Sequence, residues 1–216
     1  MQLRVLSVSD RVEEVIYSPN LRQRFKNIDF AISCGDLPYY YVEYIVSMLD
    51  KPVFFVRGNH AKILEQSDSG SRTAPQGAVN MHRHSVRYSD VLMAGVEGSI
   101  RYKPGPYQYS QNEMWMNVFS LLPGMISNRI QYGRYLDILI THSAPWGIGD
   151  RDDWPHQGIK AFRWLIDVFK PRYHFHGHIH LYGPKVVREI DYRQTQVINT
   201  YGYRLNILNF ASITQS

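Results

Sequence analysis

The sequence has little cysteine and no long hydrophobic run. Its single cysteine, Cys34, excludes an intramolecular disulfide and favours a reducing compartment. No window approaches the ~18 consecutive apolar residues of a membrane span. Residues 1–10, MQLRVLSVSD, lack the apolar stretch and the cleavage site of a signal peptide. We therefore expect a cytoplasmic protein with no membrane partner.

Charge of one sign is also scarce. Lysine and arginine number 24 against 19 for aspartate and glutamate, so the net charge is only +5. This excess suits an anionic substrate, but it is too weak and scattered either to indicate or to exclude nucleic acid. The length fits a single domain, expected over residues 1–216, and 44% hydrophobic residues can form a sizeable core. The sequence does not determine an oligomeric state.

Six short apolar runs predict buried β-strands, because continuous runs of this length are typical of strands covered on both faces. The run VLMAGVEG (91–98) ends in glycine without a metal-ligand type. The other five end abruptly in glycine, aspartate, asparagine, histidine or serine. They are LRVLSVSD (3–10), FAISCGD (30–36), VFFVRGNH (53–60), DILITHSAP (137–145) and YHFHGH (173–178).

Helical patterns lie between several of these runs. Apolar spacings of three and four predict helices over residues 38–50, 111–127 and 157–170, the second of them broken near Pro123. Strands that alternate with helices indicate an α/β fold. Residues 185–210 alternate β-branched and polar residues, which predicts closing antiparallel strands.

Nitrogen and oxygen ligand types collect at the ends of the predicted strands. In open α/β sheets, ligands bind beyond the carboxyl ends of the strands, which would bring these side chains together. Imidazole and carboxylate groups suit Mn, Fe, Zn or Ni better than a soft metal. The set consists of Asp10, Asp36, Asn59, His60, His142, His178 and His180.

The motifs in this set resemble those of the calcineurin-like metallophosphoesterase family. They are SD (9–10), GD (35–36), GNH (58–60), TH (141–142) and GHIH (177–180), in the family's order. The resemblance covers roughly residues 3–181. It implies a four-layer sandwich of two mixed β-sheets flanked by helices, with two metal ions at one edge.

The resemblance also implies a role for each residue. Asp36 would bridge the two metals, Asp10 and His180 would hold the first, and Asn59, His142 and His178 would hold the second. His60 would face the leaving group, where it is the candidate general acid. Two cations about 3.5–4 Å apart can clamp a phosphoryl group and lower the pKa of a shared water from about 15.7 toward about 7. The nucleophile would then be hydroxide, without a nucleophilic serine or cysteine.

The first motif departs from the family pattern. The family's Asp-x-His reads Asp10-Arg11-Val12 here, and a valine cannot bind a metal. We therefore expect two metals with the first site weakened, or a mononuclear site. Glu13, Glu14 or a water are the alternatives for the missing ligand. The family's GNHD reads GNHA, with Ala61 in place of the aspartate.

Two further residues are candidates for substrate contact. Tyr39 follows Asp36 closely, and it either lines the substrate pocket or packs in the core. His156 either approaches the substrate or helps to begin a helix. His174 and His176 alternate with apolar or small residues along a predicted strand, so we expect them to be packed rather than ligands.

The predicted function is metal-dependent hydrolysis of a small phosphorylated substrate through a metal-activated hydroxide. Phosphodiesters or nucleotide-like esters are favoured over phosphoproteins. One reason is that Tyr39 occupies the position at which the protein-phosphatase branch has an aspartate that orients the histidine. The other is that aromatic-rich loops can stack a base. The alternative is a non-catalytic protein-interaction scaffold, the use that a retromer subunit makes of this fold. Val12 and Ala61 favour that alternative, whereas the retained histidines count against it. A DNA nuclease is less favoured, because the chain has little room for DNA-gripping domains.

Overall fold

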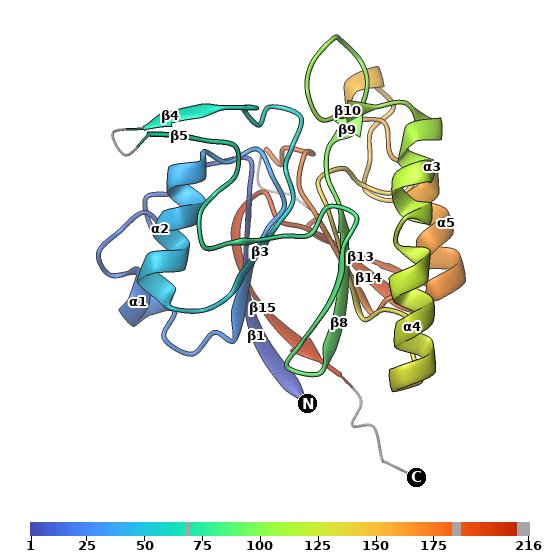
Figure 1. Ribbon diagram of the computed structural model, residues 1–216, viewed down its shortest axis with the longest axis horizontal. Coiled ribbons are helices and arrows are strands. Elements are labelled where there is room, and N and C mark those ends of the chain that lie inside the picture. Colours follow the sequence, from blue (N-terminus) through green and yellow to red (C-terminus); the bar gives the residue numbers. More distant parts are fainter. Residues whose placement is uncertain (68–69, 183–186, 211–216) are drawn as a thin grey trace.

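The computed structural model describes residues 1–67, 70–182 and 187–210. Two β-sheets face each other between two layers of helices, which confirms the predicted four-layer α/β class (Figure 1). The five-stranded sheet has the order β15-β1-β2-β3-β6. Its strands are β1 (Gln2–Ser9), β2 (Phe30–Ser33), β3 (Val53–Phe55), β6 (Val79–Asn80) and β15 (Gly202–Asn209).

The six-stranded sheet has the order β13-β14-β12-β11-β8-β7. Its strands are β7 (Ser85–Tyr88), β8 (Val91–Val96), β11 (Ile138–Thr141), β12 (Tyr173–His176), β13 (Glu189–Tyr192) and β14 (Thr195–Asn199). The six apolar runs of the sequence correspond to β1, β2, β3, β8, β11 and β12.

The central strands of each sheet are parallel, and antiparallel strands lie at one edge of the five-stranded sheet (β15) and at both edges of the six-stranded sheet (β13 and β7). β1, β2, β3 and β6 run parallel, as do β8, β11, β12 and β14. The carboxyl ends of these central strands therefore lie at the same edge of each sheet. The tail closes both sheets with antiparallel strands, as expected: β13 pairs with β14, and β15 pairs with β1. The parallel pairing of β14 with β12 was not predicted, and the first two residues of the predicted tail, 185–186, lie outside the described ranges.

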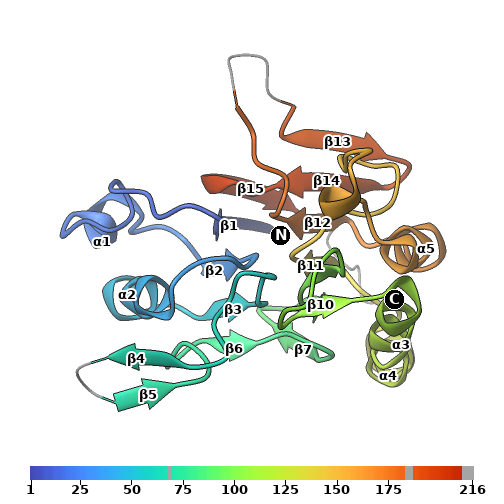
Figure 2. The ribbon, with the colours of Figure 1, turned by 90° about the horizontal axis from the view of Figure 1, so that it is seen from above.

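Helices cover the outer face of each sheet (Figures 1 and 2). α1 (Leu21–Arg24) and α2 (Tyr39–Leu49) cover the five-stranded sheet, and α3 (Gln111–Phe119), α4 (Leu122–Tyr132) and α5 (Lys160–Phe169) cover the other. The predicted break in 111–127 falls before Pro123, which lies in the first turn of α4. Proline is tolerated there because the first N–H groups of a helix have no intrahelical partner.

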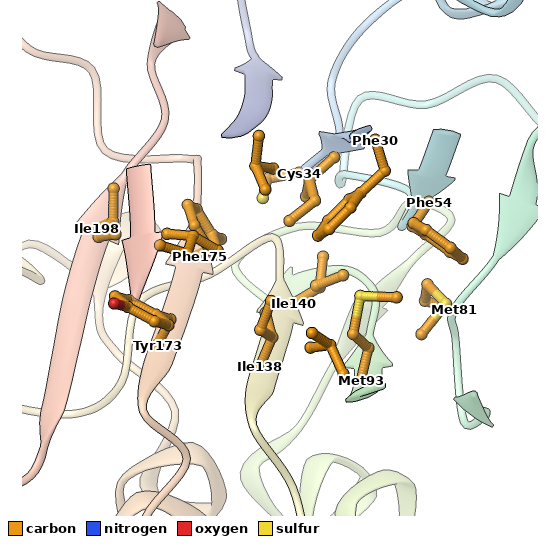
Figure 3. Close-up of a cluster of buried hydrophobic side chains, with 14 of the residues drawn as sticks. Phe30, Cys34, Phe54, Met81, Met93, Ile138, Ile140, Tyr173, Phe175 and Ile198 are labelled. Atoms are coloured by element: carbon orange, nitrogen blue, oxygen red, sulfur yellow. The ribbon is translucent and has the colours of Figure 1, made fainter. Parts of the chain in front are cut away.

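The inner faces of the two sheets form one hydrophobic layer (Figure 3). Phe30 and Phe54 from one sheet face Met93, Ile140 and Phe175 from the other, and all are buried. Because the outer faces are buried as well, the central strands are apolar on both sides. This explains why they read as continuous apolar runs.

Short elements surround the carboxyl ends of the strands. They are β4 (Glu65–Ser67), β5 (Gly70–Arg72), β9 (Ser99–Ile100), β10 (Gln108–Tyr109) and the 3-10 turn η1 (Trp154–His156). Within the described ranges, none of the helices has the length and apolar character needed to cross a bilayer.

Candidate metal centre

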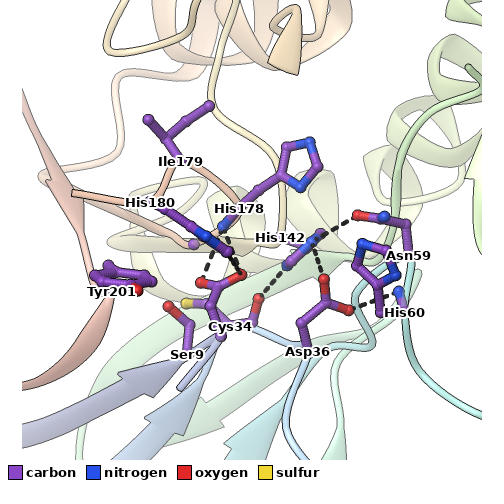
Figure 4. Close-up of polar contacts among 12 residues, drawn as sticks. Ser9, Cys34, Asp36, Asn59, His60, His142, His178, Ile179, His180 and Tyr201 are labelled. Atoms are coloured by element: carbon purple, nitrogen blue, oxygen red, sulfur yellow. Dashed lines mark hydrogen bonds and ion pairs between the residues drawn. The ribbon is translucent and has the colours of Figure 1, made fainter. Parts of the chain in front are cut away.

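The six predicted metal ligands follow the carboxyl ends of five parallel strands and gather between the two sheets. Asp10, Asp36 and Asn59 come after β1, β2 and β3, and the histidines come after β11 and β12. Figure 4 shows the side chains of five of them converging from opposite sheets: Asp36, Asn59, His142, His178 and His180. The spatial convergence predicted from the strand ends is therefore present.

Three ligand atoms meet at His142. Its Nε2 lies 3.2 Å from Asp36 Oδ2 and 3.0 Å from Asn59 Oδ1. Among the described residues, Asp36, His142 and His178 form a group whose ligand atoms all lie within 4.8 Å of one another. These residues, with Asn59, are the ligands expected for the second metal. The donor set, two imidazoles with a carboxylate and an amide oxygen, fits the metals expected from the sequence.

Backbone carbonyls orient both imidazoles. His142 Nδ1 lies 2.7 Å from the Cys34 carbonyl, and His178 Nε2 lies 2.8 Å from the Pro155 carbonyl. A carbonyl oxygen can only accept, so both nitrogens carry hydrogens. In the neutral rings, His142 Nε2 and His178 Nδ1 are then left as lone-pair donors for a metal.

The backbone is strained at the site. Asp10, Asp36 and His178 have φ values of +63°, +54° and +64°, in the left-handed region that non-glycine residues rarely occupy. Such strain tends to concentrate at functional sites. Gly177 explains one close approach, because a Cβ there would lie 2.6 Å from Asp10 Oδ2. The turn after β12 therefore requires glycine.

The ligands expected for the first metal are less closely assembled. The Asp10 carboxylate accepts the His178 backbone N–H at 3.0 and 3.1 Å. His180 Nε2 is 3.8 Å from Asp10 Oδ1, and the His180 side chain remains 41% exposed. Its Nδ1 lies 2.8 Å from the Tyr182 hydroxyl, and its ring contacts Tyr201.

Position 12, where the family pattern has a histidine, is accessible to solvent. Val12 is 37% exposed, so it is not packed in the core. Glu13 Oε1 lies 3.4 Å from Arg11 Nε, and the same oxygen would lie 2.7 Å from a Cβ at Gly202. Glu14 is exposed. Glu13 is thus already paired with Arg11, and its carboxylate lies close to the start of β15.

Opposite charges stabilise each other at the centre of the site. Burial by itself would raise the pKa of Asp36, but the His142 imidazolium and the His60 backbone N–H lower it to about 2. Burial would likewise lower the pKa of His142, but the Asp36 carboxylate raises it to about 9. In the protein alone, a proton on His142 Nε2 thus supplies positive charge between the ligand oxygens. A metal ion would have to displace this proton.

Burial shifts the other two groups toward their neutral forms. Burial, with a smaller effect from Asp36, raises the pKa of Asp10 to about 6, although His142 opposes the shift. Burial and the charge of His142 lower the pKa of His178 to about 3. Neutral imidazole is the form that binds a metal, and a nearby cation would favour the ionised Asp10 carboxylate. The residues present therefore fit a divalent cation.

His60 and Tyr39 lie beside a cavity of about 280 Å³. The His60 backbone N–H donates to Asp36 Oδ1 at 2.7 Å, while its side chain is exposed at the cavity edge. Tyr39 is only 4% exposed, yet it lines the same cavity. Tyr39 is therefore both packed in the core and part of the cavity wall, the two positions considered for it from the sequence. Its contact with substrate stays a prediction.

The remaining histidines divide between the site and the core. His156 ends the turn η1, and its ring centroid lies 5.2 Å from that of His178, so it borders the site. His156 Nδ1 is held 2.5 Å from Asp153 Oδ2. His174 and His176 are buried in β12, as expected, and His174 Nε2 lies 2.7 Å from Thr141 Oγ1.

An ionic cluster around the buried Glu97 was not predicted. Glu97 lies just after β8, and Arg57 Nη1 approaches its Oε2 at 3.1 Å. The Tyr109 hydroxyl donates to Glu97 Oε1 at 3.0 Å, and His82 Nε2 lies 3.6 Å from that oxygen. The Gly98 N–H donates to the Arg57 carbonyl at 2.9 Å, one residue before the GNH motif. The sequence signal that could have indicated this cluster was Glu97, a charged residue inside an apolar run at the end of a predicted strand.

Comparison with known proteins agrees with the fold. The family model described as calcineurin-like phosphoesterase matches residues 8–182. The crystal structure of TT1561 of Thermus thermophilus has a TM-score of 0.62 at 13% identity, over 97% of this chain and 99% of that one. Vps29 of Entamoeba histolytica, complexed with Zn²⁺, has a TM-score of 0.43 at 12% identity, over 93% of this chain and 74% of that one. Among curated proteins, none matches the sequence.

The similarity to these solved structures shows the fold alone, because the identities are low. The family match is more informative, since residues 8–182 contain every predicted metal ligand from Asp10 to His180. On that match, this chain belongs to the calcineurin-like phosphoesterase family.

Proposed function

We propose that the protein is a metal-dependent hydrolase of phosphate esters, and that its substrates are small phosphodiesters or nucleotide-like esters. Membership of the calcineurin-like phosphoesterase family supports the hydrolase. The observation that carries the proposal is the group of Asp36, His142 and His178, with ligand atoms within 4.8 Å, next to the cavity lined by His60.

Asp36, Asn59, His142 and His178 would hold a divalent ion of Mn, Fe, Zn or Ni. A first, weaker site would use Asp10 and His180, with Asp36 shared between the two. When bound, the metal supplies polarisation of the phosphoryl group and a lowered pKa for a nearby water. The buried ligands are fixed by their backbone partners, so the site is organised before substrate arrives.

His60 would act on the leaving group. Hydrolysis breaks the bond between phosphorus and the leaving oxygen, the oxygen of water joins phosphorus, and the leaving oxygen gains a proton. The His60 side chain lies at the cavity edge, where it can donate that proton. Its own backbone N–H is bonded to Asp36, which fixes its position relative to the ligands.

The experiment is a metal titration with a substrate panel. The full chain is freed of metal with a chelator, and Mn²⁺ is returned while hydrolysis of aryl and alkyl phosphomonoesters and phosphodiesters is measured. Activity should depend on Mn²⁺, and Asp36→Asn should lose both metal and activity. Asp50→Asn is the matched control, because Asp50 is exposed and has a similar φ of +51°. Unchanged metal content in Asp36→Asn, or no metal-dependent hydrolysis of any ester, would refute the proposal.

One observation favours the alternative of a protein-interaction scaffold. The helices over the six-stranded sheet expose large apolar side chains, among them Met116 at 66% and Ile130 at 80%. A scaffold, however, has no need of buried His142 and Asn59 bonded to each other. The two functions separate in the titration above, since a scaffold would bind Mn²⁺ without turnover of any ester.

A further inference from the structure

A cavity lies beside the candidate metal centre, and His60 is one of the residues that line it. It lies between the segment that leads into α2 and the segment 60–65, and it has a volume of about 280 Å³. Asp36, a candidate metal ligand, and His60 are among its lining residues. Any group held there would lie next to the position where the phosphoryl group meets the metal ligands.

Hydrogen bonds hold the two walls of the cavity together. The Tyr39 hydroxyl donates to the Lys62 carbonyl at 2.7 Å, and the Tyr39 backbone N–H donates to Glu65 Oε2 at 2.9 Å. Arg72 approaches the same Glu65 oxygen at 3.5 Å and also pairs with Glu43 of α2. Because both walls are tied to α2, the cavity exists before any ligand enters.

The lining is mainly apolar and aromatic. Leu37, Pro38 and Ala61 supply apolar surface, and Tyr40 supplies an aromatic ring that is 43% exposed. The Tyr17 ring packs edge-on against Tyr40, with centroids 5.6 Å apart at 71°. A supported aromatic ring beside apolar residues is suited to stacking against a flat ring.

The size of the cavity limits what it can hold. A cavity of about 150 Å³ accommodates benzene, so 280 Å³ has room for a larger ring system with part of a sugar. It lies just below the range of about 300–1,000 Å³ that is typical of whole small-molecule sites. Lys62 adds a cation to the wall, which can contact the polar edge of such a group.

We propose that this cavity is a leaving-group subsite that binds an alcohol carrying an aromatic ring system of nucleobase size, such as a nucleoside. The inference rests on the proposed function, because it names the part of the substrate that leaves. The ring stacks against Tyr40 between the apolar walls, and Lys62 contacts its polar edge. The ester oxygen then lies toward His60 and Asp36.

The test measures binding without chemistry. Adenosine has no phosphate, so its binding to the full chain can be followed by amide chemical shifts, with a chelator present to remove metal. Shifts should concentrate at Leu37, Tyr40, Ala61 and Lys62. Tyr40→Ala should weaken binding roughly 5- to 150-fold, the range for loss of base stacking. Tyr40→Phe keeps the ring and should bind like wild type.

Two further variants decide the outcome. Tyr44→Ala removes a tyrosine of the same helix that contacts Tyr17 but does not line the cavity, and it should leave binding unchanged. Ala61→Leu fills the cavity and should weaken binding. The subsite is refuted if adenosine does not bind, if the shifts lie elsewhere, or if Tyr44→Ala weakens binding as much as Tyr40→Ala. Because no metal or turnover is needed, these results are independent of whether the protein hydrolyses esters.

Discussion

Replacing His60 with alanine removes the side chain at the cavity edge but keeps the backbone N–H that donates to Asp36 Oδ1 at 2.7 Å. Metal content should therefore stay close to that of the wild type. Turnover of an ester with a poor leaving group should fall about 10²–10⁴-fold, the usual contribution of a positioned general acid. This corresponds to about 2.7–5.4 kcal/mol of activation free energy, at about 1.36 kcal/mol per tenfold.

The leaving group distinguishes proton donation from other roles of His60. A p-nitrophenolate ion leaves without a proton, so the loss in His60→Ala should be much smaller for a p-nitrophenyl ester than for a methyl ester of the same phosphate. The assay is kcat for both esters, with elemental analysis of each preparation. His84→Ala is the control, because His84 is also exposed but lies on the loop before β7. Equal losses on both esters would show that His60 does not act as the acid.

Glu97→Ala should lower the free energy of unfolding by about 1–3 kcal/mol, because it removes the buried carboxylate that pairs with the partly buried Arg57 guanidinium. In urea titrations, Glu189→Ala, at a more exposed ion pair, should cost less than about 1 kcal/mol. Burial holds the pKa of His174 well below 6.5, so below about pH 6.5 only the unfolded chain gains this proton. Stability should then fall with decreasing pH by up to about 1.4 kcal/mol per unit, and His174→Leu should remove that part of the slope. Val12→His should tighten the weaker metal in an Mn²⁺ titration, whereas two metals retained by the wild type after dialysis would contradict a weak site.

The convergence of the candidate ligands could be predicted because it depends on a regular feature of the fold. Parallel strands end at one edge of a sheet, so a ligand residue after each apolar run marks the same region of space. Asp36 after β2 and His142 after β11 are read in this way without knowledge of any contact. The break between α3 and α4 lies just before Pro123, and Pro123 itself belongs to the first turn of α4. The sequence could not place it more closely, because a proline inside a helical pattern is compatible with either a break or a helix start.

The contacts that orient the ligands could not be predicted. His142 and His178 are held by the carbonyls of Cys34 and Pro155. Every residue has a carbonyl, so these contacts leave no signal in the residue types. Pro155 is far from His178 in the sequence, and its position depends on how the turn η1 packs. Glu97 left a weak signal, a charge in an apolar run, but its partners become evident only when the two sheets face each other.

The two-sheet origin of the site links metal binding to folding. Asp36 and Asn59 extend from the five-stranded sheet, whereas His142 and His178 extend from the six-stranded sheet. A cation shared by these residues would join the sheets at one edge, and the unfolded chain offers no such preformed set. Its binding would therefore stabilise the folded chain by RT ln(1 + [L]/Kd), about 2.7 kcal/mol at a hundredfold excess over Kd. Asp36→Asn should lose this stabilisation together with metal, so its unfolding should no longer respond to Mn²⁺.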